Sequence, residues 1–189
     1  YLNIKMELEI YDIGYKIAPL INAAGRLSNA NQIVELFTTK SSNRILEILQ
    51  HICKLNDQRK LIEDNILNDL RLENLNNEKG INFIYKPNLH EGLIGIIASR
   101  IKEYYNKPCL VLTNSKNIVK GSARSTTDFN IGELIQKTCK LGITLNGGGH
   151  NLAAGVSLKR IKLNSFKNYL NKIYNSKITH PKSFYTTIV

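Results

Sequence analysis

The sequence has little of what builds a metal, zinc or disulfide site. Its three cysteines lie far apart and form no Cys-x-x-Cys pair, so neither a zinc site nor a disulfide framework is expected. We expect Cys53, Cys109 and Cys139 to be small buried thiols in a reducing compartment. The five aspartates and four histidines are scattered without metal-ligand spacing. We therefore expect this chain to bind no metal on its own and to lack a complete hydrolytic centre.

Long apolar runs and common catalytic motifs are absent as well. No segment has the length and apolarity of a membrane span, and the first residues do not resemble a signal peptide. The sequence contains neither a Walker phosphate-binding loop nor a Gly-x-Ser-x-Gly nucleophile elbow. These absences predict a cytoplasmic protein with no membrane partner. Because the first residue is Tyr1 and not Met, we expect a piece of a longer protein.

The charge is strongly one-sided. The formal net charge is +11 over 189 residues and the pI is about 9.6, which favours a polyanionic partner such as nucleic acid. Lys, Asn and Ile are abundant, so a solvated lysine-rich surface is the alternative explanation. Two arginines, Arg26 and Arg124, are more informative, because each lies within a segment rich in Gly, Ser and Ala.

Hydrophobic periodicity predicts helices up to about Leu75 and an α/β layer structure beyond Gly80. The stretch up to Arg26 is predicted to be loop-like, followed by a short helix over 31–37. From Ser41 to about Leu75 there is no Gly or Pro, and apolar residues recur at helical spacing. We predict one amphipathic helix, roughly 50 Å long, that connects two domains. Beyond Gly80 we predict strands over 81–85, 108–112, 118–123 and 154–158, and helices over 93–105, 131–141 and 165–174.

A run of three glycines is the clearest candidate site. Gly147, Gly148 and Gly149 are followed by His150 and then by small residues. We predict a loop whose glycines adopt positive φ, so that their N–H groups line an anion-attracting surface beside one imidazole. The alternative is a simple glycine-rich turn.

The segment Lys120–Thr126 is the second candidate. Ser122, Arg124 and Ser125 follow a strand, and hydroxyls and a guanidinium are the groups that grip a phosphate. The alternative is a polar loop in which Ser125, Thr126 or Asp128 caps the helix that begins near Ile131.

Two further segments carry weaker signals. His90 precedes a glycine that opens a helix, where an anion is stabilised, although a capping or surface histidine is the alternative. Arg26 follows Asn22 and three small residues, so its side chain can reach across a cleft or stand in solvent.

These segments, taken in order, resemble the RecJ-type exonucleases of the DHH phosphoesterase superfamily. The resemblance rests on the following motifs: Pro19-Leu20-Ile21-Asn22-Ala23-Ala24-Gly25-Arg26-Leu27, Asn56-Asp57-Gln58-Arg59-Lys60, His90-Glu91-Gly92-Leu93-Ile94-Gly95-Ile96-Ile97-Ala98-Ser99-Arg100, Gly121-Ser122-Ala123-Arg124-Ser125, and Gly147-Gly148-Gly149-His150 with Ala153-Ala154-Gly155.

The resemblance implies an α/β fold with a mixed-sheet DHH-associated domain preceded by a long connecting helix. Residues 1–40 would end the catalytic (DHH) domain, 41–79 would form the helix, 80–178 would form the DHH-associated domain, and 179–189 would lead toward a missing OB-fold. The Asp-His-His motif that binds two Mn²⁺ or Mg²⁺ ions in this family is absent here. The metals would therefore belong to a missing domain of the parent enzyme.

The resemblance also implies roles and partners. Ser122, Ser125, Arg124, Asn22 and Arg26 would bind substrate around a 5′ phosphate. The glycines at 147, 148 and 149 would contact the neighbouring nucleotide, with the histidines at 150 and 90 as catalytic residues. Tyr85, Tyr105 and Phe129 are candidate stacking rings.

The implied function is the substrate-binding part of a metal-dependent 5′ to 3′ exonuclease for single-stranded DNA in repair and recombination. A helicase or a single-strand-binding protein would be a partner, and this chain alone is expected to be inactive. The alternatives are a non-catalytic nucleic-acid-binding module and a short-oligonucleotide phosphatase of the same superfamily.

Overall fold

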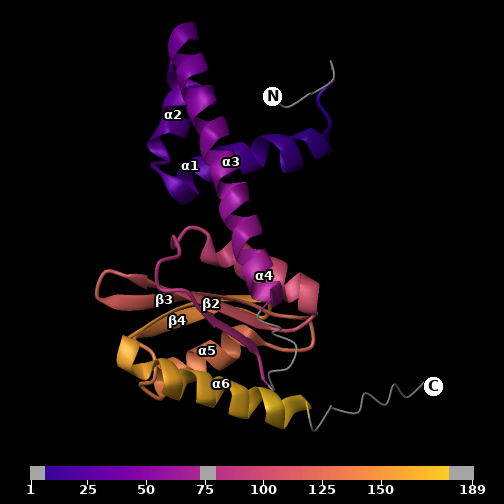
Figure 1. Ribbon diagram of the computed structural model, residues 1–189, viewed down its shortest axis with the longest axis vertical. Helices are drawn as coiled ribbons and strands as arrows, with labels where there is room; N and C mark the ends of the chain where they lie inside the picture. Colours follow the sequence, from indigo (N-terminus) through magenta and orange to yellow (C-terminus); the bar gives the residue numbers. More distant parts are fainter. Residues whose placement is uncertain (1–6, 73–79, 179–189) are drawn as a thin grey trace, which may run out of the picture. The chain divides into compact units, whose positions relative to one another are not determined.

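The computed structural model describes residues 7–72 and 80–178, which form two compact units. Unit 1 holds residues 7–72 together with 90–93, and unit 2 holds residues 80–89 and 94–178. Figure 1 shows helices alone at the N-terminal end of the chain and a sheet with helices in unit 2. None of the described helices is long and apolar enough to cross a membrane.

Unit 1 is helical throughout. A π-helical segment, η1 (Asp12–Ile17), leads into α1 (Ala18–Leu27), which is followed by α2 (Asn31–Thr38) and α3 (Ser42–Leu72). The predicted loop up to Arg26 is therefore wrong. The sequence folds as α1 because Ala23 and Ala24, both fully buried, let this helix pack closely against Ile48 and Ile52 of α3.

The predicted long helix is confirmed over Ser42–Leu72, and the predicted residues 73–75 lie outside the described residues. Its 31 residues span about 47 Å at 1.5 Å per residue. One face buries apolar side chains against α1 in unit 1. The role of this helix as a connector between domains, and the boundaries at 40 and 79, stay predictions.

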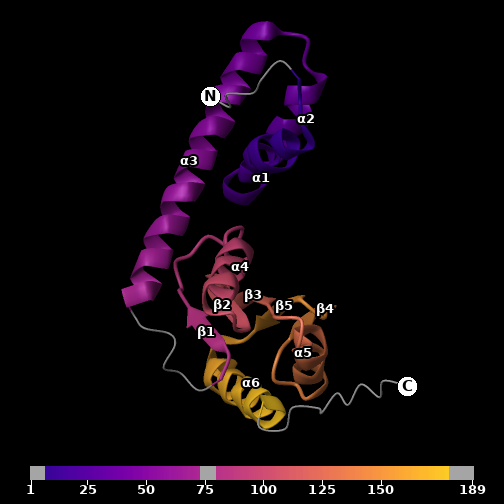
Figure 2. The ribbon, with the colours of Figure 1, turned by 90° about the vertical axis from the view of Figure 1, so that its right-hand side faces the viewer.

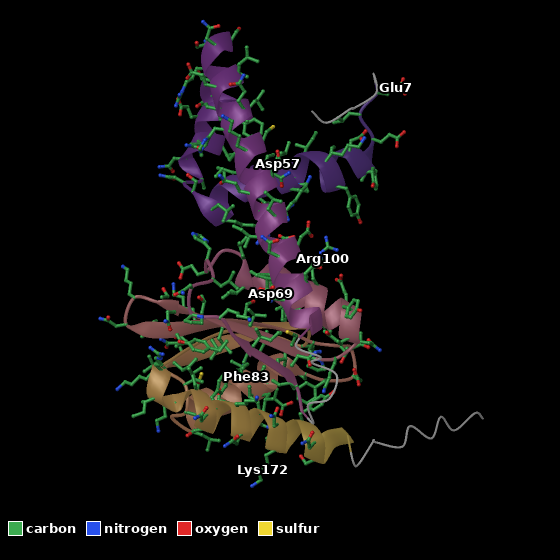
Figure 3. All side chains as sticks on the ribbon, viewed as in Figure 1. Glu7, Asp57, Asp69, Phe83, Arg100 and Lys172 are labelled. Atoms are coloured by element: carbon green, nitrogen blue, oxygen red, sulfur yellow. The ribbon has the colours of Figure 1, made fainter. Side chains whose placement is uncertain are left out.

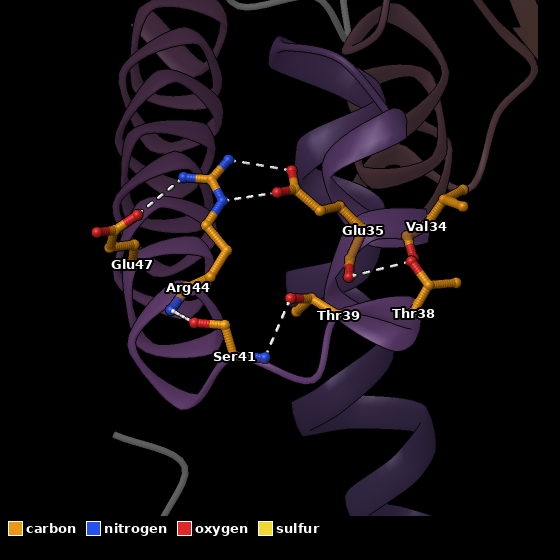
Figure 4. Close-up of polar contacts among 7 residues, drawn as sticks. All are labelled: Val34, Glu35, Thr38, Thr39, Ser41, Arg44 and Glu47. Atoms are coloured by element: carbon orange, nitrogen blue, oxygen red, sulfur yellow. Dashed lines mark hydrogen bonds and ion pairs between the residues drawn. The ribbon is translucent and has the colours of Figure 1, made fainter.

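An exposed ion-pair cluster joins α2 to the start of α3. Arg44 donates to both carboxylate oxygens of Glu35, at 2.6 and 3.0 Å, and to Glu47 at 2.9 Å (Figure 4). The backbone N–H of Arg44 also donates to the hydroxyl of Ser41, which precedes the helix. Because these groups are solvent-exposed, they fix the geometry of the turn more than they stabilise the fold.

Unit 2 is a five-stranded mixed sheet with helices on both faces. Its elements are β1 (Asn82–Tyr85), α4 (Ile94–Tyr105), β2 (Cys109–Ser115), β3 (Ile118–Arg124), α5 (Ile131–Lys140), β4 (Asn146–His150), β5 (Ala153–Leu158), η3 (Arg160–Lys162) and α6 (Leu163–Ile178). The strand order is β1-β2-β3-β5-β4, with β1 parallel to β2 and the other neighbours antiparallel. The predicted α/β class and mixed sheet are confirmed.

The two faces of this sheet are covered differently. Helices α5 and α6 cover one face, and their Ile135, Phe166 and Leu170 pack into the main core with Leu110 and Leu112 of β2. On the opposite face, α4 packs over β2 and β3. Figures 1 and 2 show this three-layer arrangement within the unit. The open part of the α4 face is where the candidate site lies.

Candidate nucleic-acid interface

Three strands of unit 2 bring predicted site residues into one row. The register pairs Ser122 of β3 with Gly155 of β5, and Gly155 with Gly148 of β4. Cross-strand partners share a face of the sheet, so the three residues lie side by side. A Cβ placed on Gly95 of α4 would be 3.4 Å from the Ser122 hydroxyl, which identifies this as the α4 face.

The next row holds two of the four charged or titratable side chains predicted for the site. Arg124, Ala153 and His150 are cross-strand partners on β3, β5 and β4. They lie on the same face as the first row, because side chains two residues apart in a strand point the same way. Arg124 and His150 are therefore two strand spacings apart, about 10 Å, with only the small Ala153 between them.

Arg124 is held in place by neighbouring polar atoms. Its Nη1 donates to the hydroxyl of Ser122 at 2.9 Å and to the carbonyl of Ala123 at 2.8 Å. A Cβ on Gly95 would lie only 3.1 Å from its Nη2, so α4 covers the guanidinium closely. The guanidinium and the hydroxyl thus form a joined pair that can donate to an anion together.

His150 is exposed at the end of the edge strand. Its Nδ1 accepts a hydrogen bond from the backbone N–H of Leu152 at 3.4 Å. In the neutral ring this pattern assigns the proton to Nε2, which then becomes a donor for a ligand oxygen.

The glycines of this region fall into two classes. A Cβ built on Gly148 or on Gly155 meets nothing within 4 Å, so the space above both residues is open. A Cβ on Gly147 would lie 2.6 Å from Ile135 of α5, and one on Gly149 would lie 2.2 Å from a backbone carbonyl oxygen of β5. Packing therefore requires glycine at 147 and 149, but it does not require glycine at 148 and 155.

A third row continues the same face. Lys120, Ser157 and Asn146 are cross-strand partners two residues further along the three strands. We call the face formed by all three rows the glycine platform, and its nine residues are Lys120, Ser122, Arg124, Asn146, Gly148, His150, Ala153, Gly155 and Ser157. The alternation in β3 could have identified Lys120 from the sequence, because Lys120, Ser122 and Arg124 are spaced by two.

The predicted loop at the triple glycine is wrong. Residues Asn146–His150 form the edge strand β4, and among the described glycines only Gly80 and Gly142 have positive φ. Glycine disfavours strands by its own propensity, but pairing with β5 and close packing on α5 outweigh that preference here.

The helix cap predicted at Asp128 is wrong, and Ser125 is placed away from the platform. Ser125 is only 3% exposed, and its hydroxyl donates to the carbonyl of Phe129 at 2.6 Å, so it stabilises the turn before α5. The helix is capped by Asn130, whose side chain accepts from the N–H of Glu133.

The three candidate stacking rings lie in different environments. Phe129 is 4% exposed and packs edge-on against Tyr174, so it belongs to the core and offers no face for a base. Tyr85 donates its hydroxyl to Asn114 at 2.6 Å, and Tyr105 packs edge-on against Tyr104.

The other predicted ligands lie in unit 1. Asn22 and Arg26, four residues apart on α1, line one open pocket of about 450 Å³ together with apolar side chains of α1 and α2. Arg26 donates through Nη1 to the carbonyl of Gly92 at 3.1 Å. His90 is exposed, and its Nδ1 accepts from the N–H of the same glycine at 3.2 Å.

The sequence analysis assigned no role to a polar network on α3 whose charges act on Arg26. Arg59 of α3 donates to Asn56 at 3.1 Å and to Glu63 at 2.7 Å, and both partners are buried. Burial and then the positive charge of Arg59 lower the pKa of Arg26, whereas the carboxylate of Glu63 raises it. The spacing of Asn56, Arg59 and Glu63 by three and four residues was the available signal.

The described residues offer no group of three or more His, Cys, Asp or Glu side chains that could hold a metal ion. The donor set in this part of the chain therefore does not fit a two-metal centre.

Comparison with known proteins agrees with this architecture. Residues 78–176 match the DHHA1 domain family. The single-stranded-DNA-specific exonuclease RecJ of Haemophilus influenzae is 33% identical over 171 residues, which cover 85% of this chain and 30% of that protein. The chain thus spans less than a third of that relative's length.

Solved structures of RecJ share the fold. RecJ from Thermus thermophilus in complex with Mn²⁺ superposes with a TM-score of 0.76 at 28% identity, covering 87% of this chain and 24% of that one. A manganese-bound exonuclease RecJ gives a TM-score of 0.75 at 28% identity over 88% of this chain and 41% of that one. The chain belongs to the DHHA1 family and corresponds in sequence and fold to the DHHA1-containing part of RecJ-type exonucleases.

Proposed function

We propose that this chain is the substrate-holding part of a 5′ to 3′ exonuclease specific for single-stranded DNA. In this proposal the glycine platform carries the sugar–phosphate backbone, and Ser122 with Arg124 binds the 5′-terminal phosphate. The metal ions that hydrolyse the bond are held by a part of the longer protein outside this chain. The names of the relatives and their Mn²⁺-containing structures support this division of labour.

The observation that carries the proposal is the open space above Gly148 and Gly155 beside a guanidinium. Glycine weakens a strand interior, and neither packing nor positive φ demands it at these two positions. A ligand that must touch the bare backbone explains both residues. An anionic ligand also explains Arg124 in the adjacent row and the net charge of +11.

His150 is proposed to donate Nε2–H to a phosphate oxygen at the far side of the row from Arg124. Two donors on opposite sides of Ala153 would orient the strand and neutralise charge that builds up during hydrolysis. His90 is proposed to contact substrate as well, because its ring is exposed while its Nδ1 is held by the backbone.

Asn22 and Arg26 of unit 1 are proposed as a further contact to the substrate. Their shared open pocket supports this, and so does the positive charge of Arg26 at its wall. The parent protein would act in DNA repair and recombination, with a helicase or a single-strand-binding protein as its partner.

The test compares binding of single-stranded DNA with and without a 5′ phosphate by fluorescence anisotropy. We expect the native chain to prefer the phosphorylated strand and Arg124→Ala to lose that preference, with a loss of about tenfold or more, since charge-assisted bonds contribute roughly 1.5–3 kcal/mol. Arg160→Ala, at an exposed arginine of η3 outside the platform, is the matched control. Equal affinity of the native chain for both strands would refute the proposal.

A further inference from the structure

We infer that the third row of the glycine platform is a second phosphate-binding subsite, in which Lys120 contacts the DNA strand several nucleotides away from Arg124. This inference rests on the proposed function and adds the path of the strand. The row holds an ammonium, a hydroxyl and an amide from Lys120, Ser157 and Asn146, each able to donate to a phosphate or a sugar oxygen.

The spacing sets the length of ligand that can use both subsites. Lys120 and Arg124 are four residues apart on β3, which places their Cα atoms about 13 Å apart on the same face. A stacked single strand rises about 3.4 Å per nucleotide, so this distance corresponds to about four nucleotides, and to fewer in a stretched strand. A single nucleotide cannot reach both positions.

The middle row of the platform, between the two subsites, has open space above its two glycines. Gly148 and Gly155 occupy the middle row with open space above them, so a polymer backbone can pass close to the sheet. None of the nine platform residues is acidic. Both ends of the path thus attract phosphate, and the middle admits it.

Arg124 and Lys120 differ in ways that suit a terminal phosphate and an internal phosphate, respectively. Arg124, covered by α4 and bonded to Ser122, presents a fixed fork suited to a terminal phosphate group. Lys120 is exposed, and an ammonium on a flexible stem suits an internal phosphate whose position varies with sequence. We therefore assign end recognition to the first and strand tracking to the second.

The experiment compares Lys120→Gln with Lys172→Gln on the complete chain. Lys172 is an exposed lysine on α6, in the layer on the opposite face of the sheet, and Figure 3 shows it pointing away from the strands. Binding is measured with a 5′-phosphorylated dinucleotide and a 5′-phosphorylated 12-nucleotide strand, at several salt concentrations. Thermal melting confirms that both variants are folded.

We expect Lys120→Gln to weaken binding of the long strand by about three- to tenfold at low salt and to lower the salt slope by about 0.7, as for one lost phosphate contact. Binding of the dinucleotide should not change, and Lys172→Gln should change neither. An equal effect of Lys120→Gln on both lengths, or no effect, overturns the inference. If the second subsite is overturned but Arg124→Ala still removes the preference for a 5′ phosphate, the proposed function stands. If the native chain shows no preference for a 5′ phosphate, the proposed function itself fails.

Discussion

Two neighbouring glycines should respond in opposite ways to the addition of one methyl group. Gly155→Ala places a Cβ in open space on the glycine platform, whereas Gly149→Ala places one against the backbone of β5. The two positions lie on adjacent strands of the same sheet and share the same chemistry. They therefore form a matched pair that separates a requirement for ligand access from a requirement for packing.

The expected stabilities follow from the distances. At Gly155 nothing lies within 4 Å of the added carbon, so the variant should gain about 0.5–1 kcal/mol from the lower entropy of the unfolded chain. At Gly149 the added carbon would lie 2.2 Å from the carbonyl oxygen of Ala153 and 2.5 Å from the Cα of Ala154, so the strands must separate. Overpacking of this kind costs about 1–3 kcal/mol.

The affinity of Gly155→Ala for DNA should fall, although its stability should rise. Its new methyl group would stand between the ligand and the backbone, and we expect binding of 5′-phosphorylated single-stranded DNA to weaken at least tenfold, or about 1.4 kcal/mol. Urea unfolding gives the stabilities, and fluorescence anisotropy gives the affinities. Gly155→Val extends the series, because a β-branched residue suits a strand while blocking more of the face.

Two results would refute this reasoning. Native affinity in both Gly155 variants would mean that no ligand touches the platform backbone. Native stability in Gly149→Ala would mean that β4 does not pack against β5 as described.

Three further outcomes are expected. Gly92→Ala would place a Cβ 2.2 Å from the carbonyl oxygen of Arg26, so we expect a loss of about 1–3 kcal/mol in urea unfolding, and a native midpoint would contradict the contact. Glu63→Gln removes the 2.7 Å carboxylate partner of Arg59, whose side chain is only 12% exposed, so unfolding should become easier by about 3 kcal/mol, and a change below about 0.5 kcal/mol would show that the pair is dispensable. Burial raises the pKa of the Cys109 thiol, which keeps it protonated and unreactive, so iodoacetamide at pH 8 should label it only after unfolding; labelling in the native protein, read by peptide mass, would contradict its burial.

Periodic segments were predictable from the sequence, and segments shaped by close packing were not. The helix over Ser42–Leu72 repeats apolar residues through 31 positions, so its pattern was unambiguous. Helix α1 contains Pro19, the adjacent alanines Ala23 and Ala24, and Gly25, a composition that resembles a loop when the sequence is taken alone. Only the contact of the alanines with Ile48 and Ile52 explains why small residues are needed there.

The candidate site shows the same limit in a sharper form. The structure brings the predicted Ser122 and Arg124 into direct contact on one face of β3, and their role in binding phosphate stays a prediction. Lys120 was not predicted as part of the candidate site. It precedes Ser122 by two residues, so the period of two along the strand could have placed it on the same face. Ser125 was misplaced because a buried hydroxyl cannot be distinguished from an exposed one until the position of Phe129 is known.

The three consecutive glycines look alike in the sequence, but packing accounts for only two of them. Neighbouring residues in a strand face opposite sides, so Gly147 and Gly149 lie toward α5 while Gly148 faces the open platform. Glycine at 147 and 149 follows from packing distances that admit no Cβ. Glycine at 148 has no such cause, and its cross-strand partner Gly155 has none either. The fold therefore leaves these two adjacent glycines, next to the row of Arg124, without an explanation, and the DNA backbone that we propose to bind here would account for both.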